Sequence, residues 1–355
     1  MYLLLGILII TIAAAIYLHM PMFGDLPKGK YLKKIKKSPN YHSGQFHNQK
    51  PLPVRTSSNM FKTILEFIRQ QRTPVHISSS KTDLFNLDTN EEIIIWFGHS
   101  SFFIQISGKR ILVDPIFSET IAPIPFFLKA FRGSNIYLVN DMPNIDCLLI
   151  THDHWDHLDY KTVGNLKSQK IICPLGVGAH FRLWGFPHES ICEMDWDESF
   201  QISDNLSIYC LPARHFSGRG LLKNKSLWAS FLIETSDAYK IFISGDGGYD
   251  THFAEIGRRF GGIDLAILEN GQYSDGWKNI HMHPKETVQA AKDLHTKALF
   301  PVHMGKFHLA THPWNEPLNK ISKLASGENF RILTPMIGEK IELKNNKQTF
   351  KRWWQ

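Results

Sequence analysis

The chain has 355 residues, of which 43% are hydrophobic and 21% are charged. This length suits one large or two ordinary domains, and the composition excludes wholesale disorder and a membrane protein with many spans. The formal charge is +7, but six lysines lie between residues 28 and 37. Without them, 34 Lys and Arg face 33 Asp and Glu. The basic character is therefore local, and no nucleic-acid partner is expected.

The first 18 residues, MYLLLGILIITIAAAIYL, carry no charge, and the uncharged stretch continues to Gly24. An apolar run of about 20 residues is long enough to cross a bilayer. No Lys or Arg precedes it, which argues against a cleaved signal peptide, although residues 13–15 resemble a cleavage site. We expect residues 1–23 to form a membrane anchor, with a signal peptide or a buried helix as alternatives. The lysines that follow predict that the rest of the chain faces the cytoplasm.

Residues 24–92 are rich in Ser, Asn, Gln, Lys and Pro, with one helix-like stretch near 60–71. They are expected to form a basic collar, suited to an anionic membrane surface, and an arm that leads into the body. From residue 93 the pattern changes to short apolar runs broken by turns. The runs are IIIWF (93–97), SFFIQI (101–106), RILVD (110–114), CLLIT (147–151), KIIC (170–173), LSIYCL (206–211), WASFLIE (228–234), KIFIS (240–244), DLAILE (264–269) and ALFPV (298–302).

So many short strands predict stacked sheets. Helical patterns stand near 251–260 and 284–295, and Pro284 suits a first helical turn. We therefore expect one compact α/β domain over 93–345, followed by a short tail at 346–355.

A cluster of histidines and aspartates follows the apolar run CLLI directly, in the segment THDHWDHLD. So many imidazoles and carboxylates would make a poor core, because buried charged groups must be paired. In an extended loop, His152 and His154 can point the same way and chelate one ion. Asp156 and His157 can then turn toward a second ion. Imidazole and carboxylate are ligands that suit Zn²⁺.

Three further candidate ligands each come after an apolar strand run. His215 follows LSIYCLPAR, Asp246 follows KIFISG, and His303 follows LFPV. Loops after strands converge at one edge of a sheet, where binding sites commonly form. We therefore expect these three side chains to join the histidine cluster.

The H-x-H-x-D-H pattern resembles the metallo-β-lactamase fold superfamily, which implies an αββα sandwich of two mixed sheets flanked by helices. The chain is more closely similar to the family of N-acylphosphatidylethanolamine-hydrolysing phospholipases D, over roughly residues 93–317. The blocks that carry this resemblance are WFGHSSFFIQI, LVDPIFS, ITHDHWDHLDY, LPARHFSGRG, FISGDGGYD, EIGRRFG and VHMGKFHLA.

The resemblance implies two Zn²⁺ ions. One would be held by His152, His154 and His215. The second would be held by Asp156, His157 and His303, and Asp246 would bridge the two. A related di-iron branch of the superfamily has Glu at the position of His154, so zinc is favoured.

The resemblance also implies roles beside the metal ligands. His281 aligns with a histidine that contacts the substrate phosphate region, so we expect it to stabilise phosphoryl charge or assist the leaving group. The alternative is a loop histidine that only supports the metal ligands or is solvated. Tyr160 is a weaker candidate for a phosphate contact. Asp114 is expected to orient the histidine loop by hydrogen bonds, and His99 to act similarly. The apolar loop 119–133 is expected to line an entrance for acyl chains.

The implied function is a membrane-anchored, zinc-dependent phosphodiesterase of the phospholipase D type, with Asp156, Asp246 and His281 as catalytic residues. It would convert N-acylphosphatidylethanolamine, or a related glycerophospholipid, to N-acylethanolamine and phosphatidic acid. One alternative is a hydrolase of the same fold that acts on a soluble phosphodiester or lactone. Another is a non-catalytic zinc-binding membrane module. The lipase relatives suggest a homodimer.

Overall fold

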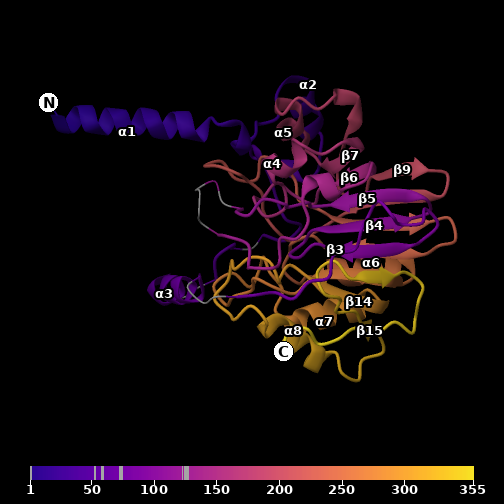
Figure 1. Ribbon diagram of the computed structural model, residues 1–355. Coiled ribbons are helices and arrows are strands. Elements are labelled where there is room, and N and C mark those ends of the chain that lie inside the picture. The colour runs from indigo at the N-terminus through magenta and orange to yellow at the C-terminus, as the bar shows by residue number, and fades with distance from the viewer. Residues whose placement is uncertain (1, 52, 57–59, 72–74, 122, 124–127) are drawn as a thin grey trace.

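The protein is described by a computed structural model that covers residues 2–51, 53–56, 60–71, 75–121, 123 and 128–355. Two seven-stranded sheets face each other, and helices lie on their outer faces (Figure 1). The predicted αββα sandwich is therefore confirmed.

Both sheets are mixed, with an antiparallel half and a parallel half. In the first sheet the pairs from β16 to β5 are antiparallel and those from β5 to β8 are parallel. Its strands, in spatial order, are β16 (Lys340–Glu342), β3 (Ile93–Trp96), β4 (Phe102–Ile106), β5 (Lys109–Val113), β6 (Ile145–Leu149), β7 (Ser168–Pro174) and β8 (Ile191–Met194).

The second sheet repeats this arrangement, antiparallel from β9 to β12 and parallel from β12 to β15. Its strands, in spatial order, are β15 (Arg331–Ile332), β14 (Thr296–Val302), β13 (Ile263–Glu269), β12 (Lys240–Ile243), β11 (Ser230–Thr235), β10 (Leu206–Leu211) and β9 (Ser199–Ser203). A small separate hairpin consists of β1 (Tyr41–His42) and β2 (Gln45–Phe46).

Both faces of the central strands are buried. Because successive side chains of a strand point to opposite sides of the sheet, such a strand contributes both to the core between the sheets and to an outer core. In β3, Ile94 and Trp96 pack into the core between the sheets, whereas Ile93 and Ile95 pack on the outer side. The helices are α1 (Tyr2–Leu18), α2 (Gly29–Ile35), α3 (Met60–Gln71), α4 (Tyr160–Val163), α5 (Gly178–Leu183), α6 (His252–Phe260), α7 (Pro284–Asp293) and α8 (Glu316–Leu324). Helices α4 and α5 contribute to the outer core of the first sheet, and α6, α7 and α8 contribute to that of the second. Three short 3-10 turns complete the structure at Pro21–Phe23, Val139–Asp141 and His188–Ser190.

The two sheets meet next to the ends of β3 and β14. The backbone N–H of His99 donates to the carbonyl of Met304 at 2.8 Å, and the N–H of His303 donates to the carbonyl of His99 at 3.0 Å. This short bridge brings the loop after β3 against the loop after β14, and it fixes where side chains from the two sheets meet.

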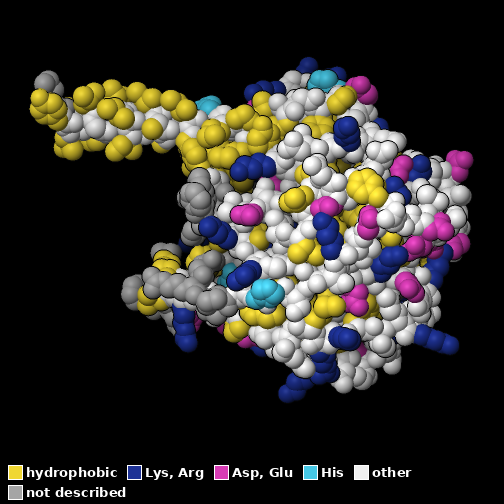
Figure 2. Space-filling model, in the orientation of Figure 1, with side chains coloured by type: hydrophobic (Ala, Val, Ile, Leu, Met, Phe, Trp, Pro, Cys, Tyr) yellow, Lys and Arg dark blue, Asp and Glu magenta, His cyan; other side chains and the backbone are white. Residues whose placement is uncertain are grey.

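The N-terminal helix α1 projects away from the body, and its hydrophobic side chains lie on the surface (Figures 1 and 2). It has 17 residues, which at about 1.5 Å per residue is shorter than the ~30 Å hydrocarbon core of a bilayer. Among the described residues, none of the helices combines the length and the apolar character needed to cross a membrane. The predicted membrane anchor at 1–23, with the body facing the cytoplasm, is therefore wrong. The helix stops before Pro21, whose ring cannot continue it.

The collar and the tail both pack on the body. In α2, the Tyr31 ring lies under the Arg182 guanidinium, 3.5 Å from it, and the Lys34 ammonium donates to the Glu193 carbonyl. At the other end, Trp354 is buried and its indole N–H donates to Asn319 of α8 at 3.0 Å. The boundaries of the arm, the catalytic domain and the tail stay predictions.

Candidate metal centre

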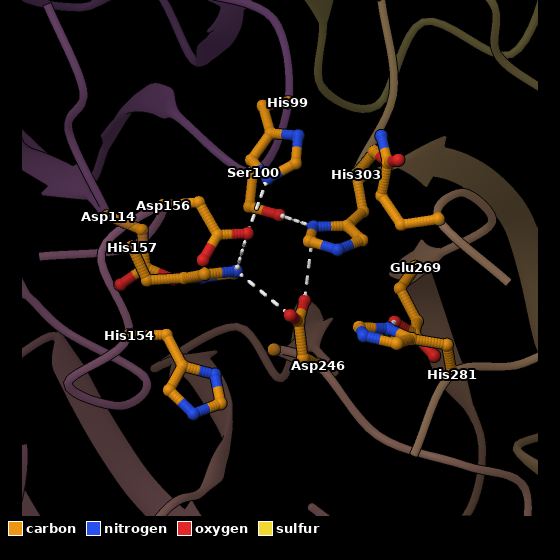
Figure 3. A network of polar contacts seen from close by, with 12 residues as sticks. His99, Ser100, Asp114, His154, Asp156, His157, Asp246, Glu269, His281 and His303 are labelled. Carbon is orange, nitrogen blue, oxygen red and sulfur yellow. Dashed lines mark hydrogen bonds and ion pairs between the residues drawn. The ribbon is translucent and has the colours of Figure 1, made fainter. Parts of the chain in front are cut away.

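Seven side chains from four loops meet where the two sheets join, each loop directly following a strand. Figure 3 labels His154, Asp156, His157, Asp246 and His303 among them. Four come from the loop after β6 in the first sheet, and one each from the loops after β10, β12 and β14 in the second. They are His152, His154, Asp156, His157, His215, Asp246 and His303. The structure thus brings together every predicted metal ligand.

One group consists of His152, His154 and His215, whose ligand atoms all lie within 4.8 Å of one another. Nδ1 of His154 lies 3.0 Å from Nε2 of His152 and 3.2 Å from Nε2 of His215. A second group consists of Asp156, His157 and His303, together with His99. These are the two sets that the sequence assigns to separate ions.

Asp246 lies between the two groups. Its Oδ2 is 3.1 Å from Nε2 of His157, and its Oδ1 is 3.2 Å from Nδ1 of His303. The same Oδ2 is 3.9 Å from Nε2 of both His152 and His215. Its carboxylate is thus within reach of both groups, as a bridging ligand must be. Burial raises the pKa of Asp246 to about 6, so a positive charge is needed to keep it ionised at lower pH.

The residues fit a divalent metal. Nε2 of His303 is buried and has no hydrogen-bond partner in the described part of the chain. Burial lowers the pKa of His152, His215 and His303 well below the ordinary value. Neutral imidazole is the form that binds metal, whereas crowded buried histidines without a metal would leave polar nitrogens unsatisfied.

Two buried residues, Asp114 and His99, contact the candidate ligands on the side away from the cavity. Asp114 accepts a hydrogen bond from Nδ1 of His157 at 2.8 Å, and it also binds the backbone N–H and the hydroxyl of Thr151. The hydrogen bonds expected of Asp114 are therefore present. Nε2 of His99 lies 2.9 Å from Oδ2 of Asp156, which fixes that carboxylate in turn. Such contacts set the orientation of metal ligands.

His281 stands just before α7 and beside the ligands. Its ring centroid is 5.1 Å from that of His303 and 5.3 Å from that of His215. Its Nδ1 lies 2.7 Å from Oε2 of the buried Glu269. Burial lowers the pKa of the imidazole. The ring also lines a cavity of about 290 Å³, together with Val54, Arg55, His154, Asp156, His215, Phe216, Asp246, Gln272, Trp277, Ile280, His303 and Leu309.

Tyr160 lies elsewhere. It begins α4, its ring contacts Trp184, and it lines a neighbouring cavity of about 640 Å³ with Trp155 and Met22. It does not line the cavity that holds His281 and the ligands, so its phosphate contact stays a prediction. The predicted acyl-chain entrance at 119–133 falls partly on residues 122 and 124–127, which lie outside the described residues.

The structure adds three residues that the sequence did not single out. Glu269 is the last residue of β13. Asp246 was identified as a polar residue at the end of an apolar run, and the same pattern identifies Glu269. Asn48 and Arg55 belong to the arm, where no local pattern marks them. The Asn48 amide donates to the carbonyl of His215 at 2.8 Å and accepts from its N–H at 3.1 Å. Arg55 lines the metal-site cavity.

Comparison with known proteins identifies the family. Residues 109–304 match a family described as a beta-lactamase superfamily domain. An uncharacterised protein of Mycobacterium tuberculosis is 35% identical over 329 residues, which cover 90% of this chain and 88% of that protein. The mitochondrial N-acyl-phosphatidylethanolamine-hydrolyzing phospholipase D of Saccharomyces cerevisiae is 34% identical over 257 residues, 69% of this chain and 54% of the yeast protein.

Among solved structures, a metallo hydrolase from the archaeon Ignicoccus hospitalis shares the fold, with a TM-score of 0.53 at 20% identity over 70% of this chain and 97% of that one. The predicted resemblance and metal dependence are confirmed, whereas the choice of zinc stays a prediction. The chain belongs to the beta-lactamase superfamily and is a metal-dependent hydrolase, with relatives among the N-acylphosphatidylethanolamine-hydrolysing phospholipases D.

Proposed function

We propose that the protein is a zinc-dependent phosphodiesterase of the phospholipase D type. It hydrolyses N-acylphosphatidylethanolamine, or a related glycerophospholipid, to N-acylethanolamine and phosphatidic acid. The observation that carries the proposal is the pair of ligand groups that share Asp246 in a cavity also lined by His281. The name of the yeast relative supports the substrate class.

The donor set supports zinc. Five of the seven ligands are histidines, and imidazole with carboxylate is a common zinc environment. Two bound zinc ions would lower the pKa of a shared water and polarise a phosphoryl oxygen. We assign Asp156 and Asp246 to the ions and the attacking water, and His281 to the phosphoryl charge or the leaving oxygen.

The cavity wall supports a phosphodiester with an apolar part. Arg55 is among the residues that line the cavity, and a guanidinium is a group that pairs well with phosphate oxygens. Val54, Phe216, Trp277 and Leu309 add apolar surface to the same cavity. We therefore propose that the phosphate lies between Arg55 and the ligand groups.

We also propose that the protein works at a phospholipid surface, and that it forms a homodimer. Ile64, Leu65 and Ile68 of α3 are exposed, and apolar side chains gathered on one helix face suit contact with lipid. Sedimentation with vesicles containing N-acylphosphatidylethanolamine tests the first point, with Ile64→Ser/Ile68→Ser as the variant expected to bind less. Light scattering behind a sizing column tests the dimer.

The decisive experiment is mass spectrometry of the products. Zinc-loaded protein is incubated with a phospholipid extract that contains added N-acylphosphatidylethanolamine, beside an Asp246→Asn variant. Release of N-acylethanolamine with matching phosphatidic acid, absent with the variant, is the expected result. Cleavage of a soluble phosphodiester or lactone while every lipid survives would contradict the substrate. No turnover of any of these would favour a non-catalytic zinc-binding module.

A further inference from the structure

Glu269 is a fully buried carboxyl group beside the metal centre. Its exposed fraction is 0%. The backbone fixes its position, because it pairs with Val302 in the sheet and its N–H donates to the hydroxyl of Ser244 at 3.0 Å. Its carbonyl accepts a hydrogen bond from the hydroxyl of Thr287 in α7 at 3.0 Å. The side chain of Glu269 therefore points toward the loop that precedes α7.

Both carboxyl oxygens of Glu269 have partners in that loop. Oε1 accepts a hydrogen bond from the backbone N–H of Met282 at 2.5 Å. Oε2 lies 2.7 Å from Nδ1 of His281. Glu269, His281, Asp246 and His303 also form a group whose ligand atoms lie within 4.8 Å of one another. Because both of its oxygens are engaged, the structure favours Glu269 as a partner of the histidine over a role as a further metal ligand.

The contact with Glu269 assigns the two nitrogens of His281 to different tasks. The 2.7 Å contact places one shared proton between Oε2 of Glu269 and Nδ1 of His281. Nε2 is then the nitrogen left for the substrate. Figure 3 shows the ring of His281 pointing toward Asp246, between Glu269 and the ligand groups.

We propose that Glu269 is a positioning residue that sets His281 to deliver a proton from Nε2 to the leaving oxygen of the phosphodiester. The inference rests on the proposed function. In this step the attacking water oxygen forms a bond to phosphorus, and the bond between phosphorus and the leaving oxygen breaks. The electron pair of that bond stays on the leaving oxygen, which takes the proton from Nε2. The proton that the water loses passes to solvent, from which His281 is protonated again.

The variant Glu269→Gln makes the idea testable, because it keeps the size of the side chain and changes its hydrogen bonding. The amide oxygen would face the N–H of Met282, which needs an acceptor. The amide NH₂ would then donate to Nδ1 of His281, so Nδ1 could no longer carry a proton. Without the proton shared with Glu269, the ring could not give up its Nε2 proton and remain neutral.

The kinetic test compares two substrates of the zinc-loaded enzyme, a diester with an alkyl leaving group and one with a p-nitrophenyl leaving group. Loss of a positioned proton donor costs about 10²- to 10⁴-fold in rate. We expect Glu269→Gln to lower kcat at least about 100-fold with the alkyl substrate, with KM little changed. We expect only a small loss with p-nitrophenyl, which leaves without a proton. A similar loss with both substrates would overturn the proposal.

Two further variants supply the controls. Glu286→Gln makes the same chemical change in the same segment, where Glu286 accepts a hydrogen bond from the N–H of His283 that Gln can also accept. It should behave as the wild type. In a His281→Ala background, Glu269→Gln should cause no further loss, because its partner is gone. A full additional loss there would show that Glu269 acts independently of His281.

Two measurements do not need activity. The metal content of Glu269→Gln should equal that of the wild type, and loss of an ion would instead make Glu269 a ligand. In ¹⁵N-histidine NMR spectra, with His281 assigned by comparison with His281→Ala, Nδ1 should lose the proton that it shares with Glu269 in Glu269→Gln. An unchanged signal would overturn the proposal. If the wild type cleaves the synthetic diesters but no lipid, the proposed lipid substrate is wrong. The kinetic comparison of wild type with Glu269→Gln on the synthetic diesters then still tests the role of Glu269.

Discussion

At the scale of single residues, the metal centre consists of ligands and of the groups that orient them. Asp114, His99 and Glu269 each hold one functional side chain through a bond of 2.7 to 2.9 Å. The convergence of the candidate ligands could be predicted because four of them stand in one short motif. Glu269 was missed because its importance depends on His281, which is distant in sequence and adjacent only in the folded chain.

The role of Asp114 can be tested with Asp114→Asn. Asn tolerates the positive φ of this position, 39°, so the backbone should be kept. The hydrogen bond to Nδ1 of His157 would weaken, and the second ion should bind about 10- to 100-fold less tightly. Competition with a chromophoric zinc chelator measures this loss.

The control for Asp114→Asn is Asp146→Asn, which changes a carboxylate on β6 that binds the N–H of Arg110. It should leave both zinc affinities unchanged. Equal weakening of both ions by Asp114→Asn would contradict the assignment, since Asp114 hydrogen-bonds directly to His157 and reaches His152 only through the hydroxyl of Thr151.

At the scale of secondary structure, apolar runs predicted the long central strands well. The segments 206–211 and 264–269 are strands β10 and β13 within one residue of the expected bounds. The strands β8, β9, β15 and β16 were missed, because they lie toward the ends of the sheets and have two to five residues with partly exposed side chains. At this length, pairing with a neighbour decides the conformation more than local sequence does.

The arm is the element whose contribution the sequence revealed least. Asn48 binds both backbone polar groups of His215, and its Oδ1 also accepts from the indole of Trp228 at 3.1 Å. The arm thereby fixes the loop that carries one ligand of the first group. Composition alone marked this region only as polar.

The variant Asn48→Ala should show how much this contact contributes. Leaving buried backbone groups of His215 without partners should lower the free energy of unfolding by about 1–3 kcal/mol. Urea denaturation of metal-free protein measures the change. Asn165→Ala, which removes an exposed amide bonded only to Lys161 nearby, is the control. A loss no greater than that of the control would contradict the role of the arm.

At the scale of the whole molecule, the candidate ligands come from loops of both sheets. Bound ions should therefore stabilise the packing of one sheet against the other. The sequence predicted the sandwich and the residues at its edge. It failed for α1, where an uncharged run was read as a membrane anchor although the helix ends after 17 residues. Apolar composition says that a segment avoids water, but only the length of the helix decides whether it can span a bilayer.

Removal of zinc should therefore lower the stability of the whole body. Ligand held at about 1,000 times its Kd stabilises a fold by about 4 kcal/mol. A strong chelator should thus lower Tm by roughly 10 °C, given about 2–4 °C per kcal/mol for a domain of this size. Scanning calorimetry measures the shift. Asp246→Asn should show a smaller effect of the chelator, and an unchanged Tm in wild type that has lost its zinc would contradict the prediction.

Lys306 should make stability depend on pH. Its ammonium is buried and donates to the carbonyls of Phe97 at 3.2 Å and Ile116 at 2.7 Å. Burial lowers its pKa to about 7, whereas an unfolded lysine titrates near 10.4. Between these values the unfolded chain binds more protons, so this contribution to stability grows as pH rises and is lost as pH falls toward about 7.

The test compares wild type with Lys306→Met at pH 6.5 and pH 9. The free energy of unfolding of the wild type relative to Lys306→Met should be about 2.5 kcal/mol higher at pH 9 than at pH 6.5, at about 1.4 kcal/mol per pH unit above the folded pKa. Urea denaturation at the two pH values measures it, with the exposed Lys278→Met as the control. A difference independent of pH would show that the lysine stays charged in the fold.

The bridge between His99 and Met304 also has a consequence for the order of assembly. The loop after β6 carries four ligands close together, so it can take up an ion weakly as soon as it is synthesised. The complete centre requires His303, which the bridge positions only when the second sheet has docked on the first. Strand β16, which closes the first sheet beside β3, follows all seven ligands in the chain. We therefore expect tight capture of the second ion to come late in folding, after both sheets have reached their final places.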